Sequence, residues 1–158
     1  ITQLAVRVYL VDELGNALAV REVATARDYL LPNETTPYGA QFEQTPYHYS
    51  GAVAEVARAL RNTQNLPQLS VERLHSTYAE GRYVLSGELR NHGERPAENL
   101  SLVATLYDED GRVTGFRHWR LPPDQILPPK QHLPFQLSVI PHLAGTHSVM
   151  AAAEGRLP

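Results

Sequence analysis

The chain has 158 residues, of which 42% are hydrophobic, and a formal net charge of −3. This composition is sufficient for a folded core and too weakly charged for a disordered chain. The charges form no basic run, which argues against a nucleic-acid partner and against a polybasic membrane patch. Cysteine is absent, which excludes disulfides, thiol catalysis and thiolate metal sites. The longest apolar runs, such as LSLVATLY, are too short to span a bilayer, so we predict no membrane segment in this chain.

The first predicted strand contains Val6, Val8 and Leu10, which share one face because successive side chains of a strand point to opposite sides. The DELGNA stretch at residues 12–17 follows, and its Asp and Gly are typical of a hairpin turn. The same alternation returns at residues 38–42, where the sequence YGAQF predicts another strand.

Residues 50–60 allow two interpretations. Val53, Val56, Ala57 and Leu60 follow helical spacing, and alanine and arginine favour a helix. The alternation of the same stretch is in phase with the last strand of the chain, which favours a strand. We favour the strand and keep the helix as the alternative. The polar stretch RNTQNLPQ at residues 61–68 is the predicted linker.

The second half of the chain alternates over several short stretches separated by turn residues. The alternating stretches are YVLSGELR, NLSLVATLYD and FQLSVIP, preceded by LSVERLHSTYAEG and followed by THSVMAAAEGR. Short alternating strands bounded by glycine, proline and aspartate predict an all-β sandwich or barrel.

The two halves repeat one another. Residues 5–36 align with residues 101–132 without gaps and with eight identities in 32 positions. The alternation stays in phase, and a slip of one residue would turn each apolar face outward. The sequence therefore predicts tandem antiparallel β-sandwich modules, at residues 1–60 and 69–158. The first lacks its first strand or strands. We expect these upstream in the parent protein, or replaced by pairing with another chain, which would give a dimer.

Residues 83–156 resemble the FxLYD family of prokaryotic β-sandwich domains. The resemblance rests on GELRNHGERPAENLSLVATLYDEDGRVTGF, followed by LPP, ILPP, PFQLSV and a last strand that ends in EGR. The motif itself reads ATLYD at residues 104–108 and VYLVD at residues 8–12, without the family's Phe. The resemblance implies an immunoglobulin-like sandwich, usually in exported or membrane-anchored proteins, with no established catalytic activity.

The family's signature residues look structural, and the resemblance implies the same roles here. Leu106 would belong to the core. Asp108 would hold the turn before Gly111 by accepting hydrogen bonds from nearby backbone N–H groups. Asn91 and Gly93 would shape the preceding turn.

The seven histidines form no recognised metal-ligand spacing. His118 and His147 could meet across a sheet and bind zinc with a carboxylate, and the DEDG and DELG stretches could bind calcium. We favour surface histidines and turn-forming acids over both, and we predict no metal site and no cofactor.

Aromatic side chains are the candidate ligand contacts, because an exposed ring in a sandwich can stack on a sugar. They are Trp119, Tyr78, Tyr47 and Tyr49. The competing interpretation, which we favour, is that Trp119 fills the core beside Phe116 and that the tyrosines bridge core and solvent.

The chain has no G-x-S-x-G motif and no glycine-rich phosphate loop, so we predict that it is not an enzyme and has no catalytic residues. We predict a non-catalytic spacer or interaction module of an exported or surface-associated bacterial protein. The extracytoplasmic location is implied by the resemblance alone. The alternative is a ligand-binding module, for carbohydrate through aromatics or for peptide through an open sheet edge.

Overall fold

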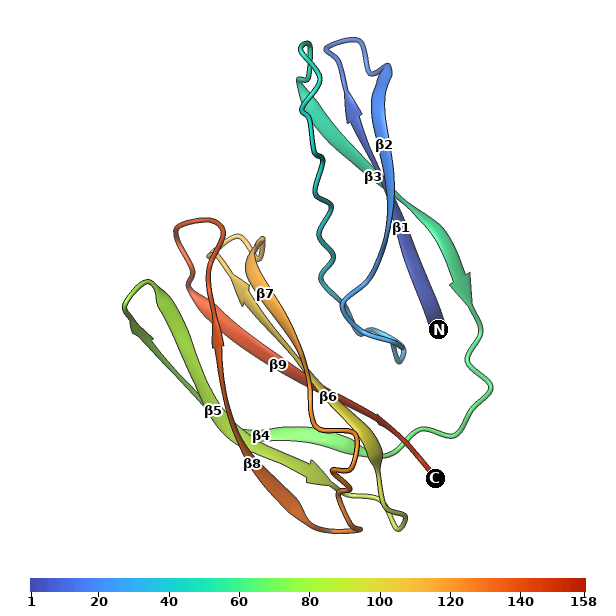
Figure 1. Cartoon of the computed structure of the whole chain (residues 1–158), viewed down its shortest axis with the longest axis vertical. Helices are drawn as coiled ribbons and strands as arrows, with labels where there is room; N and C mark the ends of the chain where they lie inside the picture. Colours follow the sequence, from blue (N-terminus) through green and yellow to red (C-terminus); the bar gives the residue numbers. More distant parts are fainter. The chain divides into compact units, whose positions relative to one another are not determined.

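The computed structural model describes residues 1–158, and every regular element in it is a β-strand (Figure 1). The chain divides into two compact units, Ile1–Thr63 and Gln64–Pro158, which we describe separately. Together they contain three antiparallel sheets of three strands each. The predicted all-β class is therefore confirmed. No helix of the structure has the length and apolar character needed to cross a bilayer.

The first unit is built on one sheet with the order β2-β1-β3. Its strands are β1 (Thr2–Val11), β2 (Ala17–Ala24) and β3 (Gly51–Leu60). The strand interpretation of the third stretch is confirmed, and the helical alternative is wrong. β3 pairs with β1 along most of its length, and these backbone hydrogen bonds outweigh the weak helix preference of its alanines.

The strand predicted at residues 38–42 is absent. The connection from β2 to β3 passes through this stretch in irregular conformation (Figure 1). The aligned stretch of the second unit is a strand because a neighbouring strand pairs with its backbone. The first unit offers no such neighbour, and alternating side chains alone cannot provide the hydrogen bonds that a strand requires.

The second unit is a sandwich of two sheets, ordered β4-β5-β8 and β7-β6-β9. The first sheet consists of β4 (Leu69–Ala79), β5 (Arg82–Asn91) and β8 (His132–Val139). The second consists of β6 (Glu98–Tyr107), β7 (Val113–Arg120) and β9 (Ser148–Arg156). The two sheets approach closely where β4 meets β9, because a Cβ on Gly155 would lie 3.0 Å from Leu69 Cδ1.

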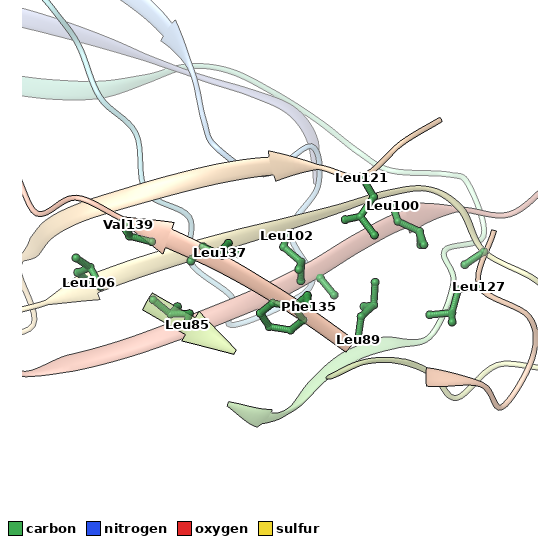
Figure 2. Close-up of a cluster of buried hydrophobic side chains, with 13 residues drawn as sticks. Leu85, Leu89, Leu100, Leu102, Leu106, Leu121, Leu127, Phe135, Leu137 and Val139 are labelled. Carbon is green, nitrogen blue, oxygen red and sulfur yellow. The ribbon is translucent and has the colours of Figure 1, made fainter. Parts of the chain in front are cut away.

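The core of the second unit lies between its two sheets (Figure 2). Leu85 and Leu89 of β5 are fully buried against Leu102 and Leu106 of β6 and the inward residues of β8. Burial of each such leucine contributes about 1.5–3 kcal/mol. The core role that the family resemblance implies for Leu106 is confirmed. The cluster comprises Leu85, Leu89, Ala97, Leu100, Leu102, Ala104, Leu106, Leu121, Leu127, Phe135, Leu137, Val139 and Ala153.

The sheet of the first unit has the same strand order and register as the β7-β6-β9 sheet. Leu10 of β1 pairs with Ala19 of β2 and Ala52 of β3. Leu106 lies 96 positions later and pairs with Gly115 of β7 and Val149 of β9, which are the aligned positions. In both sheets the pairing with the next strand shifts directly after this leucine. The two sheets therefore share this irregularity as well as their order.

One aspartate organises the first turn of each of these two sheets. Asp12 Oδ1 accepts hydrogen bonds from the backbone N–H groups two and four residues later, at 2.9 and 2.8 Å. Asp108 Oδ1 accepts the equivalent pair at 3.0 and 2.8 Å, which confirms its implied role. Gly15 and Gly111 follow with φ of +82° and +77°, a left-handed conformation that glycine adopts without steric cost. The side chain of Asn16 adds a bond to Asp12, and these hydrogen bonds lower the pKa of the Asp12 carboxyl.

Asn91 holds the turn that follows β5. Its side chain is fully buried, and Nδ2 donates to the carbonyls of Arg95 at 2.8 Å and Leu127 at 3.1 Å. Its Oδ1 accepts the N–H of Gly93 at 2.9 Å. The turn-shaping role implied for Asn91 and Gly93 is therefore confirmed.

The two matching sheets differ by one residue in β3. Ala5 pairs with Arg58 and Val6 pairs with Val56, so Ala57 is an extra residue that forms a β-bulge. In the second unit the corresponding pairs, Ser101 with Glu154 and Leu102 with Ala153, follow each other without an extra residue. The bulge lets the two ends of β3 keep the register of β9 despite the extra residue.

Candidate binding surfaces

Trp119, the only tryptophan of the chain, contacts the core of the second unit. It pairs with Leu102 across β7 and β6, and directly paired side chains lie on the same face of a sheet. Phe116 pairs with Thr105 and so lies on the opposite face. The interpretation that Trp119 packs on the core is confirmed, but its placement beside Phe116 in that core is wrong.

Trp119 also lines a shallow groove of about 470 Å³ between β7, β8 and the β4–β5 turn. Its polar lining includes the side chains of Glu80, Arg82 and Arg117. Arg117 crosses from β7 to donate a hydrogen bond to the carbonyl of Ser138 on β8, at 2.9 Å. This groove offers one aromatic side chain and several charged groups, which suits a polar ligand better than a flat sugar platform.

The other candidate aromatics do not join Trp119 in this groove. Tyr78 is 59% exposed and packs its ring against Tyr83, with the ring centroids 4.9 Å apart. Tyr47 and Tyr49 lie in the β2–β3 connection of the first unit. Two candidates therefore lie in each unit, and of the two in the second unit only Trp119 lines the groove.

The histidines considered for zinc lie apart. His118 pairs with Val103 of β6, whereas the N–H of His147 donates to the carbonyl of Tyr107 at 2.7 Å. These two points on β6 are four residues apart, or about 13 Å along a strand. No three histidine, aspartate or glutamate residues of the chain gather closely enough to hold a metal ion. The zinc and calcium alternatives therefore receive no support from the geometry.

The sheet of the first unit has one apolar face that is covered only in part. Val6, Val8 and Leu10 of β1 lie on this face and are each 7% exposed. Their partners on β3 lie on the same face, and all are exposed, with Val56 reaching 65%. These partners are Val56, Ala54 and Ala52. The face is thus buried over β1 and open over β3. We call this exposed part the β3 face.

The equivalent surface of the second unit is covered. Ala153 of β9 is only 9% exposed, and Val149 and Ala151 are half-buried. β4 contacts β9 from the opposite sheet, and its Leu69, Val71 and Leu74 pack on the same core cluster as Val149. An aligned set of small apolar side chains is therefore buried in one unit and open in the other.

Residues 38–42 form a second unsatisfied feature of the first unit. None of their backbone N–H groups donates a hydrogen bond within the protein. Arg21 donates to the carbonyl of Gln41 as Arg117 donates to Ser138 on β8. The segment is therefore held to β2 through the same kind of contact that joins β8 to β7, but it carries an unpaired row of donors.

Sequence reasoning did not single out the charged residues of the groove, and one signal could have found Arg117. It pairs with the fully buried Ala104, so it occupies a core-facing phase of β7. Arg21 occupies the same phase of β2 and is identical in the sequence repeat. A charged residue at an inward position in both halves indicates a specific polar contact, which here is the bond to a backbone carbonyl.

Comparison with known proteins gives a family but no activity. A family model described as "Protein of unknown function (DUF3426)" matches residues 64–152. No curated protein matches the sequence. A solved structure of a beta-glucuronidase from glycoside hydrolase family 2 is similar to this chain at 14% identity with a TM-score of 0.34. That match covers 90% of this chain and 18% of the enzyme, so the chain spans less than a fifth of it.

Proposed function

The chain belongs to the DUF3426 family, a family of unknown function, and on that premise we propose that it is a non-catalytic structural and interaction module made of two copies of one β-sandwich. Its mechanism is rigid display, in which stiff sheets hold loops and neighbouring segments at a fixed spacing. The proposal is carried by the shared strand order, register and irregularities of the β2-β1-β3 and β7-β6-β9 sheets.

The local contacts support a common module as well. The Asp12 and Asp108 turns accept the same pairs of backbone donors. Gln3 and Asn99, 96 positions apart, both have φ of +51° near the start of their strand. Shared exceptions of this kind are stronger support for a repeated module than shared regular strands, because each exception occurs rarely by itself.

The chemistry of the groove supports a non-catalytic role. Its lining contains one carboxylate, Glu80, beside two arginines and Trp119, with no histidine or second carboxylate. General acid–base catalysis needs a donor and an acceptor placed together, and this lining places its one carboxylate beside guanidinium groups only. The surface is therefore suited to binding rather than to proton transfer.

The resemblance of residues 83–156 to the FxLYD family supports placing the module in an exported or surface-associated bacterial protein. The absence of cysteine fits any redox compartment. The proposed location is thus extracytoplasmic, and it rests on the family resemblance alone.

The competing role is a ligand-binding module. A sugar could contact Trp119 in the groove, and a peptide could add to an open sheet edge. The half-buried state of Trp119 and its contact with the core weaken the sugar variant, because part of the side chain is already buried by the protein. The unpaired donors of residues 38–42 favour the strand-addition variant.

A thermal-shift panel separates the structural role from binding of a carbohydrate or a metal ion. The panel holds soluble polysaccharides, peptidoglycan fragments, calcium and zinc, with a chelator control. A ligand that binds only the folded state raises the melting temperature in a concentration-dependent way. We expect no shift. A shift with a polysaccharide that disappears in Trp119→Ala, but persists in Tyr78→Ala, would overturn the structural role in favour of carbohydrate binding.

A further inference from the structure

We infer that the first unit is an acceptor for a β-hairpin of the same polypeptide, carried ahead of β1. The hairpin would pair with residues 38–42 and cover the β3 face. This inference rests on the proposal that the two units are copies of one module. It goes further by stating which kind of segment covers the β3 face and where that segment pairs.

The second unit shows how such a hairpin covers this kind of sheet. β5 pairs with β8 from Tyr83–Val139 to Arg90–His132, so the edge of β8 is satisfied along its length. β4, the other strand of the hairpin, contacts β9 and packs its apolar side chains on the core cluster that Ala153 and Val149 of β9 join. One two-stranded element thus satisfies a backbone edge and an apolar surface together.

The first unit carries both of these surfaces without the element. Residues 38–42 align with residues 135–139, the C-terminal part of β8. The backbone N–H groups of residues 38–42 have no acceptor. The β3 face aligns with the surface that β4 covers on β9, and Val56 is 65% exposed there. A row of unpaired donors beside an open apolar surface is the arrangement that strand addition uses, since main-chain bonds supply affinity and alternate side chains supply fit.

The chemistry of the occupant follows from that template. Its inner strand needs apolar side chains on one face, as β5 provides with Leu85 and Leu89 on either side of Gly87. Its outer strand needs apolar contacts toward Val56 and the alanines of β3. A hairpin with one apolar and one polar face meets both needs.

The order of strands in the second unit assigns the hairpin to the same polypeptide. The β4–β5 hairpin directly precedes β6, and only residues 92–97 separate β5 from that strand. Short connections place consecutive elements side by side. A hairpin joined to β1 through an equally short connection would reach the same position, at a high effective concentration.

The test uses the chain's own hairpin as the probe. Residues 69–96 are duplicated directly ahead of Ile1, because Ala97 is the position that aligns with Ile1. In the extended protein we expect hydrogen exchange at the amides of residues 38–42 to slow by about tenfold or more, as donors gain partners. The matched control carries Leu85→Asp and Leu89→Asp in the duplicated copy only, and we expect its exchange to equal that of the unextended chain.

Two results would overturn the inference. Equal exchange at residues 38–42 in the extended and control proteins would show that the face does not accept a hairpin. A concentration-dependent dimer of the unextended chain, with these amides already protected, would assign the face to a second copy. Neither result produces a ligand shift in the thermal panel, so failure of the hairpin and failure of the structural role remain distinguishable.

Discussion

At the scale of single residues, the first turn of each matching sheet depends on one carboxylate. Asp12 accepts three hydrogen bonds within its own turn, two from backbone N–H groups and one from the Asn16 side chain. A carboxylate that accepts such bonds is stabilised in its charged form, which is why its pKa lies below the usual value.

Replacement of this carboxylate should therefore have a pH-dependent effect. We expect Asp12→Ala to lower the melting temperature of the first unit at pH 7. Because the pKa is lowered on folding, the stabilisation is fully present above the unfolded value of about 3.9 and is lost as the pH falls through the folded value. Thermal unfolding of variant and parent at pH 7 and in the acid range measures this. Glu13 is an exposed neighbour in the same turn and provides the control. Glu13→Ala should leave the difference in melting temperature between pH 7 and the acid range unchanged.

Asn91 is the residue whose polar contacts are most deeply buried. We expect Asn91→Ala to lower the free energy of unfolding of the second unit by about 1–3 kcal/mol, since the bond from the N–H of Gly93 and the bonds to three carbonyls are lost. Denaturant titration measures this loss. Gln136→Ala, on the exposed side of β8, should stay within about 0.5 kcal/mol of the parent. A variant as stable as the parent would contradict the role assigned to Asn91.

At the scale of elements, glycine in β7 reports how tightly the second unit is closed. A Cβ on Gly115 would lie 3.0 Å from the carbonyl oxygen of Ile140 and 3.0 Å from Pro141 Cα. The aligned residue in the first unit is Ala19, where the neighbouring segment carries no strand. The tighter of the two units is thus the one that contains a complete sandwich.

Addition of one methyl group tests this difference. We expect Gly115→Ala to destabilise the second unit by about 1–3 kcal/mol, because the obstructing atoms belong to the backbone and cannot rotate away. The control is Gly51→Ala, where the nearest atom lies 3.9 Å from the new Cβ. Thermal unfolding of both variants measures the effect, and equal melting temperatures would contradict the close packing of β7.

The elements also show what sequence patterns could and could not predict. The phase of Val6, Val8 and Leu10 was readable because alternation depends only on neighbours along the chain. The prediction of a strand at residues 38–42 is wrong because a strand requires a neighbouring backbone partner. Alternation along the sequence gives no information about such a partner. The groove could not be predicted because Glu80 and Trp119 line one surface only once the fold has placed β7 beside the β4–β5 turn. Local patterns thus gave faces and turns, whereas partners and surfaces required the tertiary structure.

At the scale of the whole molecule, the two units have cores of different completeness. The second buries leucines between two sheets, whereas the first leaves the β3 face open. A smaller buried apolar area gives less stabilisation. We expect the chain to unfold in two steps, with the first unit at the lower temperature.

Matched leucine variants assign the steps. We expect Leu102→Ala to destabilise the second unit by about 2–5 kcal/mol and so to shift only the transition at the higher temperature. We expect Leu10→Ala to shift only the transition at the lower temperature. Calorimetry with hydrogen exchange at each stage would report which strands open. A single cooperative transition that moves equally in both variants would show that the units unfold together.

The bulge at Ala57 has a consequence for which changes in chain length this sheet can tolerate. Removal of Ala57 would leave Arg58 next to Val56, and β3 would then pair with β1 in the uninterrupted rows seen between β9 and β6. Removal of a residue inside the regular part of β3 would instead reverse the facing of every side chain on one side of the cut. Natural length variation in this strand should therefore concentrate at position 57. A single-residue deletion scan through β3 should find its most stable product there.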